Sequence, residues 1–352
     1  MILYEVIDGY FDKYENCKIT ELSGGNINTT FLLEIYYNNR KDNYLLQMIN
    51  KNVFCDPVAV IKNSNLLLDY INEDTLYYIK TKKNTNYFLD SNKNYWRIYN
   101  YIDNSFSLSS TNNLYIIYQA GKAFGSFHKK LINFDYIKLN ETIPNFHNTS
   151  KYVEKFKILS KDKSSRFKRI QREYDKILNY ENKCTLLDRS YFSGLLPLRT
   201  THNDTKINNV LFNKRNNRYI TVIDFDTVMP GLFAHDFGDG ARSVCSVHEE
   251  DHLDYYTASF SIEKFKAYAQ GFLSQTKNIL TEYEKETLYD GILALTLELS
   301  IRFLIDYLED DIYFKTKYLE HNYVRGLNQL YLAEDIIKKE KTIKEIIYKN
   351  IK

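Results

Sequence analysis

Three polar residues occur at a spacing that suits phosphoryl transfer from ATP. In the stretch THNDTKINNVLFN, Asp204 follows His202 by two positions and Asn209 follows Asp204 by five. The β-rich run RYITVID then ends at Asp224, twenty positions after Asp204. Phosphoryl transfer needs one carboxylate to accept the proton of the attacking hydroxyl, and two oxygen ligands to hold Mg²⁺ over the phosphates. The order predicts a kinase catalytic loop with Asp204 as the base, and Asn209 and Asp224 as the metal ligands.

Two neighbouring residues extend this set. Lys206, two positions after Asp204, is predicted to contact the transferring phosphate; the competing interpretation is a lysine that faces solvent. Asp226, two positions after Asp224, is predicted to assist it as a ligand of Mg²⁺. A tight turn is the competing interpretation of the loop itself, because its histidine and asparagine would then serve only as turn caps.

An Asp-Phe-Gly triplet begins at Asp236 and competes with Asp224, which opens an Asp-Phe-Asp triplet, for the metal. It lies thirty-two positions past Asp204, and it does not follow directly on a β-rich run as Asp224 does. We therefore assign metal binding to Asp224. Asp236 is expected to hold the backbone of the catalytic loop by hydrogen bonds.

The composition is that of an ordinary globular protein that handles small molecules. Hydrophobic residues make up 44% of the 352 residues and charged residues 26%, and the net charge is only +2. This charge gives no reason to expect nucleic acid or an acidic membrane as a partner, and no apolar run is long enough to predict a membrane helix. Glu5 and Asp8 interrupt the apolar start before a signal-peptide core could form. Four cysteines without a CxxC pair suit a reducing compartment, so we expect a cytoplasmic protein.

The pattern of the sequence changes near residue 103 and predicts an α+β fold of two lobes. Before that point, short β-rich runs alternate with turn residues, and one helix is expected over residues 57–71, with Pro57 at its start. After it, apolar residues recur every three or four positions, as they do in helices. They are Ile117, Ala120, Phe124, Phe127 and Leu131, and later Leu288, Ile292, Leu295 and Leu299. We predict a β-rich lobe over residues 1–103 and a mainly helical lobe over residues 104–352, with a cleft between them.

Longer motifs surround the catalytic loop. They are THNDTKINNVLFN, VIDFDTVMPGLFAHDFGDGARS, LSGGNINTTF and IRFLIDYLEDDIYF. Together they resemble the N-acetylhexosamine 1-kinases, a branch of the aminoglycoside phosphotransferase and choline kinase superfamily, over most of the chain. The resemblance implies a bilobal protein-kinase-like fold, with a small β-rich nucleotide-binding lobe and a larger helical lobe that carries the catalytic loop and a sugar site. It also implies Mg²⁺-dependent transfer of the γ-phosphate of ATP to the anomeric hydroxyl of N-acetylglucosamine or N-acetylgalactosamine.

Arg302 is predicted to bind the acceptor. It continues the apolar stripe of the helix expected around residues 288–299, where an unpaired guanidinium would be costly. The competing interpretation is an ion pair with Asp306 one turn later, although arginine N-terminal to the acid is the poorer orientation. The resemblance implies that this segment binds the sugar, which would place Arg302 and Tyr313 on the acceptor.

The glycine-rich stretch SGGNIN matches neither common phosphate-binding motif. It lacks the lysine of G-x-x-x-x-G-K-[ST] and the spacing of G-x-G-x-x-G, so a plain hairpin turn explains Gly24 and Gly25 equally well. The resemblance implies that this loop covers the cleft, with Gly24 and Gly25 near the nucleotide and Asn26 near the sugar. Asn26 stands where the family often has a histidine.

The strand that should carry an ATP-binding lysine lacks one. The run YLLQMIN offers Gln47 instead, and we expect Gln47 to contact the nucleotide. Three explanations for the missing cation stay open. Either Lys51 or Lys206 substitutes for the lysine, or ATP is held mainly through Mg²⁺.

Two other classes of function compete with a kinase. The run HEEDH, residues 248–252, matches the zinc-protease signature H-E-x-x-H, but its acidic surroundings lack the apolar face of a packed helix and no third ligand is apparent. The missing lysine would suit a pseudokinase that binds ligands without turnover. Against the pseudokinase, the base and both metal ligands are present.

A third alternative keeps the chemistry and changes the acceptor to choline, an aminoglycoside or another small hydroxyl compound. A choline site should offer a box of aromatic and acidic side chains. The single tryptophan, Trp96, lies in the strand expected to join the lobes, so the sequence favours the sugar.

Overall fold

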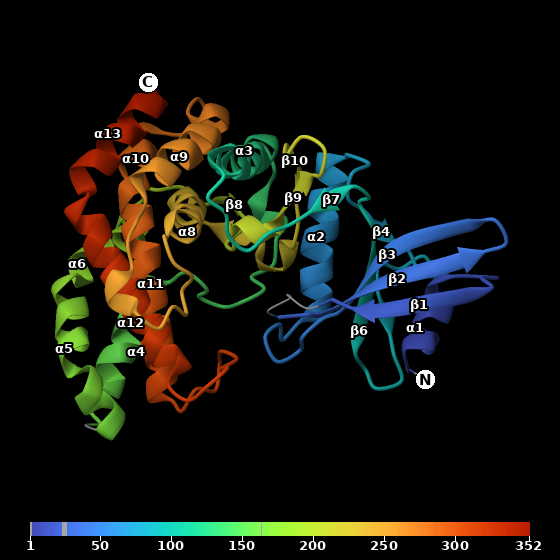
Figure 1. Cartoon of the computed structure of the whole chain (residues 1–352), viewed down its shortest axis with the longest axis horizontal. Coiled ribbons are helices and arrows are strands. Elements are labelled where there is room, and N and C mark those ends of the chain that lie inside the picture. The colour runs from blue at the N-terminus through green and yellow to red at the C-terminus, as the bar shows by residue number, and fades with distance from the viewer. Residues whose placement is uncertain (1, 23–26, 163) are drawn as a thin grey trace. The chain divides into compact units, whose positions relative to one another are not determined.

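The computed structural model describes residues 2–22, 27–162 and 164–352, which form two units. The first comprises Met1–Ser105, Ile137–Pro144 and Asp224–Met229, and the second comprises Phe106–Tyr136, Asn145–Ile223 and Pro230–Lys352. An antiparallel sheet dominates the first unit, whereas most of the helices belong to the second (Figure 1). The predicted α+β fold class is therefore confirmed.

The sheet of the first unit has the strand order β1-β2-β3-β6-β4, with β5 also paired to β6, and all these pairs are antiparallel. In β2 the aromatic and branched residues of TTFLLEIYY suit a pleated strand, and Leu33 and Ile35, two positions apart, point into the core. The bounds are β1 Asn16–Glu21, β2 Thr29–Tyr37, β3 Arg40–Met48, β4 Tyr78–Ile79, β5 Phe88–Leu89 and β6 Tyr95–Asn100.

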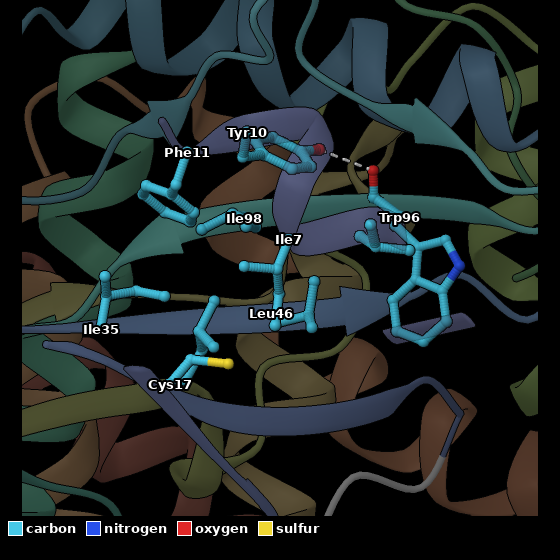
Figure 2. Close-up of a cluster of buried hydrophobic side chains, with 10 residues drawn as sticks. Ile7, Tyr10, Phe11, Cys17, Ile35, Leu46, Trp96 and Ile98 are labelled. Carbon is cyan, nitrogen blue, oxygen red and sulfur yellow. Dashed lines mark hydrogen bonds between the residues drawn. The ribbon is translucent and has the colours of Figure 1, made fainter. Parts of the chain in front are cut away.

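The core of the first unit lies between the sheet and α1 (Ile2–Tyr10), a helix that the sequence analysis did not assign. Val6 and Ile7 are fully buried, and Tyr10 donates a hydrogen bond of 2.9 Å from its hydroxyl to the carbonyl of Trp96 (Figure 2). Cys17, Leu33, Ile35, Leu46 and Ile98 complete the cluster from the strands. Full burial of such a side chain stabilises a fold by about 1.5–3 kcal/mol, so α1 helps to hold the sheet.

The predicted helix after the first three strands is confirmed as α2 (Pro57–Ile71). The side chain of Asp56 caps its first turn by accepting the N–H groups of Val58 and Ala59, and Pro57 occupies the first helical position. The fully buried Asn63 donates from Nδ2 to the carbonyls of Asn140, at 2.8 Å, and Val228, at 3.0 Å. In this way α2 binds both short segments that return to the first unit from later in the chain.

The second unit is built on long helices. Every member of the predicted stripe from Ile117 to Leu131 is buried, and α3 packs against α9. A Cβ atom on Gly121 would lie 2.3 Å from the carbonyl oxygen of Tyr268, so only glycine allows this approach of the two helices. The helix bounds are α3 Leu114–Lys130, α4 Thr149–Leu159, α5 Ser165–Asn179, α6 Glu181–Cys184, α7 Leu186–Phe192, α8 Phe233–Cys245, α9 Ile262–Thr276, α10 Glu282–Glu286, α11 Leu288–Leu308, α12 His321–Lys338 and α13 Glu340–Ile351.

The predicted stripe from Leu288 to Leu299 lies on α11, which is buried on nearly all sides by α8, α4 and α12 (Figure 1). No helix within the described residues combines the length and hydropathy needed to cross a membrane. Short elements connect the helices: β7 Ser105–Phe106, β8 Arg199–Thr201, β9 Val210–Asn213, β10 Tyr219–Val222, β11 Met229–Gly231, and the 3₁₀ turns η1 Tyr136–Lys138, η2 Ile207–Asn209, η3 Phe225–Thr227 and η4 Tyr255–Thr257.

Candidate active site

The loop between β8 and β9 brings three of the predicted residues together in the second unit. Oδ1 of Asp204 lies 3.0 Å from Nζ of Lys206, and Oδ2 accepts a hydrogen bond of 3.0 Å from Nδ2 of Asn209. The negative charge of Asp204 raises the pKa of Lys206 above its ordinary value against the opposing effect of burial, so the lysine is a cation at neutral pH. The two donors fix the direction in which the Asp204 carboxylate points.

Two acids on α8 hold the backbone of this loop. Asp236 accepts the N–H of His202 at 2.6 Å and that of Asn203 at 2.7 Å, which confirms the role predicted for it. Asp239, one turn later on the same face of the helix, accepts the N–H of Thr205 at 2.9 Å. Asp239 was not predicted from the sequence, although the spacing of the two acids in HDFGD was a visible signal.

Both acids are ionised at neutral pH in spite of their burial. Burial raises the pKa of Asp236, but the contact with His128, whose Nε2 lies 2.9 Å from Oδ2, brings it below its ordinary value. Burial also raises the pKa of Asp239, and Arg242, at 2.7 Å, outweighs it and lowers the pKa to about 2. The catalytic loop is therefore held by charge-assisted hydrogen bonds, which are the stronger kind.

The histidine and asparagine of the motif also serve the loop itself. Nε2 of His202 lies 3.0 Å from the carbonyl oxygen of Ile223, and its ring packs edge-on against Phe124 and Phe127. Asn209 donates to the carbonyl of Asp204 at 2.8 Å as well as to its carboxylate. The turn-stabilising interpretation is thus correct in part, because these side chains brace the backbone in addition to any catalytic role.

The first unit contains the two predicted aspartates that follow β10. Asp224 has left-handed backbone angles, φ 67° and ψ 65°, which are uncommon outside glycine and place it at a sharp turn. The carboxylate of Asp226 is buried between two donors: Oδ1 lies 2.6 Å from Nη1 of Arg97, and Oδ2 accepts 2.6 Å from Nδ2 of Asn28. Asp226 is therefore first of all the ionic partner of Arg97.

Gln47 lies opposite Arg97 in the pairing of β3 with β6. Its Oε1 accepts a hydrogen bond of 3.0 Å from Nε of Arg97, and its Nε2 donates to Oγ1 of Thr30 at 3.1 Å. Lys51, by contrast, extends outward and donates to the carbonyl of Lys93. Arg97 was not predicted from the sequence, although an arginine inside the apolar strand YWRIYN was a signal. The predicted residues Gly24, Gly25 and Asn26 lie outside the described residues.

Arg302 lies on α11 within a group of aromatic rings. Its guanidinium carbon is 4.9 Å from the ring centroid of Phe146, 5.3 Å from that of Tyr152 and 5.7 Å from that of Phe314. Its ionic partner is Glu298, one turn earlier, at 3.6 Å. A partly desolvated guanidinium over several aromatic faces is held by cation–π attraction as well as by charge.

The competing interpretation of Arg302 as the partner of Asp306 is wrong. The Asp306 carboxylate instead accepts the N–H of Tyr313 at 2.7 Å and of Phe314 at 2.9 Å, and so fixes the segment after α11. The Tyr313 side chain is 55% exposed and its ring contacts Phe314 edge-on, with 4.8 Å between centroids. The structure thus brings Arg302 and the Tyr313 segment to the same aromatic group.

The HEEDH run does not form a zinc-protease motif. It lies between the end of α8 at Cys245 and the start of η4 at Tyr255, outside any helix, whereas the signature requires both histidines on one helical face. The rings of His248 and His252 stack in parallel, with 4.3 Å between centroids. Across residues 2–22, 27–162 and 164–352, no cluster of three or more histidine, cysteine or acidic side chains could hold a metal ion.

Comparison with known proteins places these features in a family. Residues 18–270 match the family model described as the phosphotransferase enzyme family. An aminoglycoside phosphotransferase from Alicyclobacillus acidocaldarius has a similar structure, with a TM-score of 0.66, 11% identity, and coverage of 98% of this chain and 97% of that one. A choline kinase from Cryptosporidium parvum is also similar, with a TM-score of 0.56, 17% identity, and coverage of 95% and 91%.

A third similar structure is a spectinomycin phosphotransferase in complex with ADP and spectinomycin. Its TM-score is 0.51 at 10% identity, with coverage of 92% of this chain and 94% of that one. At such identities the likeness is one of fold alone. The predicted protein-kinase-like fold is confirmed.

Proposed function

The chain belongs to the phosphotransferase enzyme family, and we propose that it is a sugar 1-kinase. Membership makes it a phosphotransferase with a small-molecule acceptor. The finer proposal is that it transfers the γ-phosphate of ATP to the anomeric hydroxyl of N-acetylglucosamine or N-acetylgalactosamine and releases the sugar 1-phosphate and ADP. The motifs of the sequence support this choice, and the spectinomycin phosphotransferase supports the nucleotide, since its structure contains ADP.

In this proposal the residues of the catalytic loop have separate roles in phosphoryl transfer. Asp204 orients the anomeric hydroxyl and accepts its proton, as the corresponding aspartate does in kinases. Lys206, a cation beside Asp204, approaches the transferring phosphate and offsets its negative charge. The hydroxyl oxygen then forms the new bond to phosphorus as the bond to the β-phosphate oxygen breaks.

Asn209 and Asp224 are the proposed ligands of Mg²⁺, because amide and carboxylate oxygens are ligand types that this ion takes. Because Nδ2 of Asn209 is used for Asp204, its remaining polar atom is an amide oxygen, a ligand type that Mg²⁺ prefers. Asp226 fits less well, because Arg97 and Asn28 already contact its two oxygens. When bound, Mg²⁺ neutralises charge on the phosphates during transfer.

The single observation that favours a neutral sugar over choline is the position of Arg302. A quaternary ammonium group needs open aromatic faces. Here Phe146, Tyr152 and Phe314 already surround the guanidinium of Arg302. The guanidinium takes up the aromatic faces that a quaternary ammonium group would need, and its N–H groups can donate to the hydroxyl and carbonyl oxygens of an N-acetylated sugar.

Phosphorus NMR tests the proposal directly. The protein would be incubated with Mg-ATP and, in separate samples, with N-acetylglucosamine, N-acetylgalactosamine, glucosamine, galactose and choline. We expect a sugar 1-phosphate signal that grows with ADP for the N-acetylated sugars. Phosphate on another hydroxyl or on choline would refute the anomeric sugar assignment while retaining the family chemistry. ATP binding without turnover on any acceptor would favour the pseudokinase.

Arg302→Ala is expected to raise KM for the sugar by roughly 10- to 100-fold, the effect of losing one or two charge-assisted hydrogen bonds. KM for ATP should stay within about threefold, because the proposal gives Arg302 no role at the nucleotide. Initial rates at varied sugar and ATP measure both constants. Arg169→Ala is the matched control, since Arg169 also stacks on a tyrosine, Tyr323, and pairs with an acid, Glu320. Equal effects of the two variants would contradict the acceptor role.

A further inference from the structure

A histidine outside the catalytic motif, with a largely buried side chain, contacts the loop that carries Asp204. His147 lies just before α4, and its Nε2 is 3.1 Å from the carbonyl oxygen of Asn203. Its Nδ1 is 2.8 Å from Oε1 of Glu298 on α11, and its side chain is 8% exposed. The second oxygen of Glu298 accepts a hydrogen bond of 2.7 Å from Oγ1 of Thr149. Neither His147 nor Glu298 was singled out by the sequence analysis.

The partners of His147 determine its protonation. A carbonyl oxygen only accepts hydrogen bonds, and an ionised carboxylate also only accepts them. Both ring nitrogens of His147 must therefore donate. A histidine that donates from both nitrogens is an imidazolium. Burial lowers the pKa of His147, but the charge and hydrogen bond of Glu298 outweigh it and raise the pKa above its ordinary value.

The carbonyl that His147 contacts is part of the catalytic backbone. The C=O of Asn203 and the N–H of Asp204 belong to one planar peptide group. Asn203 itself has a left-handed φ of 63°, a backbone conformation that residues other than glycine adopt at a cost in free energy. Asp236 accepts a hydrogen bond from the N–H of Asn203, which belongs to the preceding peptide group. His147 contacts the C=O of the same residue, Asn203. Together the two contacts fix the peptide planes on both sides of this residue.

We propose that the His147–Glu298 pair positions Asp204 for catalysis, by donating a hydrogen bond from Nε2 to the carbonyl of Asn203. The inference rests on the proposed role of Asp204 as the base. His147 is a positioning residue, because it acts through the peptide that leads into Asp204 and not on a substrate. Since Glu298 also pairs with Arg302, one carboxylate serves both the catalytic loop and the residue proposed to bind the acceptor.

The other groups around His147 leave this assignment intact. Burial, followed by the positive charge of His147, lowers the pKa of His235 to about 3, so that ring is neutral. Its ring centroid lies 5.2 Å from that of His147. The ionisable groups that face His147 from packed elements are Glu298 and Arg302 on α11, Asp239 and His235 on α8, and Asp188 on α7.

The proposal has a pH signature. Because the pKa of His147 is raised in the folded protein, the imidazolium is fully present below the ordinary histidine value near 6.5 and is lost as pH rises through the raised pKa. The neutral ring keeps its proton on Nδ1, beside the carboxylate, and then has no proton to donate to Asn203. We therefore expect kcat to fall as pH rises through this value.

Two amide variants separate the two ring nitrogens. The amide nitrogen of glutamine reaches the place of Nε2, and that of asparagine reaches the place of Nδ1. His147→Asn is expected to lower kcat by about 10- to 100-fold, the effect of a slightly misplaced catalytic group, with KM for both substrates within about threefold. His147→Gln should recover most of the loss and should lack the fall of kcat at high pH, because an amide does not titrate.

The outcomes distinguish positioning from packing and from failure of the proposed function. Equal losses in the two variants, or an unchanged pH profile in His147→Gln, would overturn the proposal. Two measurements need no turnover. Nitrogen NMR of the histidine rings should show both nitrogens of His147 protonated near neutral pH, and the amide of Asp204 should exchange its hydrogen faster in His147→Asn than in His147→Gln. A neutral ring, or equal exchange, would overturn the proposal even if no acceptor were ever phosphorylated.

Discussion

Replacing Asp204 with asparagine is expected to lower kcat by roughly 10²- to 10⁴-fold, the range that a positioned general base contributes. Asparagine has nearly the same shape but cannot accept the proton of the anomeric hydroxyl. Its amide would also place N–H groups against Nζ of Lys206 or Nδ2 of Asn209, where the carboxylate now accepts. The rate of ADP release with saturating sugar measures the loss.

Nucleotide affinity gives this prediction its control. Calorimetric titration of Asp204→Asn with Mg-ADP should give an affinity within about threefold of the wild type, because the proposed Mg²⁺ ligands are other residues. Asp12→Asn removes an aspartate whose side chain is 75% exposed and paired with Lys82, and it should leave both quantities unchanged. Retained activity, or loss of nucleotide binding with activity, would contradict the assignment of Asp204 as base.

Arg97→Met is expected to lower the free energy of unfolding of the first unit by about 3–5 kcal/mol, because it leaves the Asp226 carboxylate buried without its ionic partner. The side chains of Arg97 and Asp226 are 1% and 3% exposed, so water cannot replace the missing charge. Asp226→Asn should cause a similar loss by isolating the guanidinium. The double variant should lose clearly less than the sum, since it leaves no unpaired charge.

Denaturant titration can follow this unit separately. The only tryptophan of the chain, Trp96, is buried in the first unit beside Arg97, so its fluorescence reports the unfolding of that unit. Arg40→Met is the matched control, because Arg40 makes an ion pair of the same length, 2.6 Å, but its side chain is 70% exposed. It should cost at most about 1 kcal/mol. Strictly additive losses in the Arg97 and Asp226 variants would show that the two charges do not stabilise each other.

The parts of the site that could be predicted from sequence are those whose partners are close in the chain. Asp204 and Asn209 contact each other across five positions, and their spacing indicated the loop once it was combined with the β-rich run that ends at Asp224. The role of Asp236 could be inferred because two similar triplets had to be distinguished. The pair of His147 and Glu298 spans 151 positions, and no local pattern relates such residues before the fold is known.

Arg302 shows a different limit, because its local partner was visible and was passed over. Acids stand at both positions one helical turn away, Glu298 before it and Asp306 after it. A glutamate N-terminal to its basic partner is the more favourable order, and Glu298 is indeed the partner observed. Asp306 instead accepts hydrogen bonds from the backbone of the segment that follows the helix. The spacing of side chains along the helix does not reveal such backbone donors. The helix α1 was also passed over, although its packed residues Ile2, Leu3, Val6, Ile7 and Tyr10 recur in the sequence at the spacing of one helical face.

Two later segments of the chain belong to the first unit, and this restricts how the protein can be divided or recombined. Ile137–Pro144 and Asp224–Met229 belong to that unit, although second-unit residues precede and follow both in sequence. A fragment that stopped at Ser105 would keep the buried guanidinium of Arg97 but lose Asp226, and would keep Asn63 without the carbonyls of Asn140 and Val228. A cut at the lobe boundary predicted near residue 103 would therefore separate buried residues from their partners. Gene fusion or domain exchange with a relative would have to carry three separate stretches of sequence together.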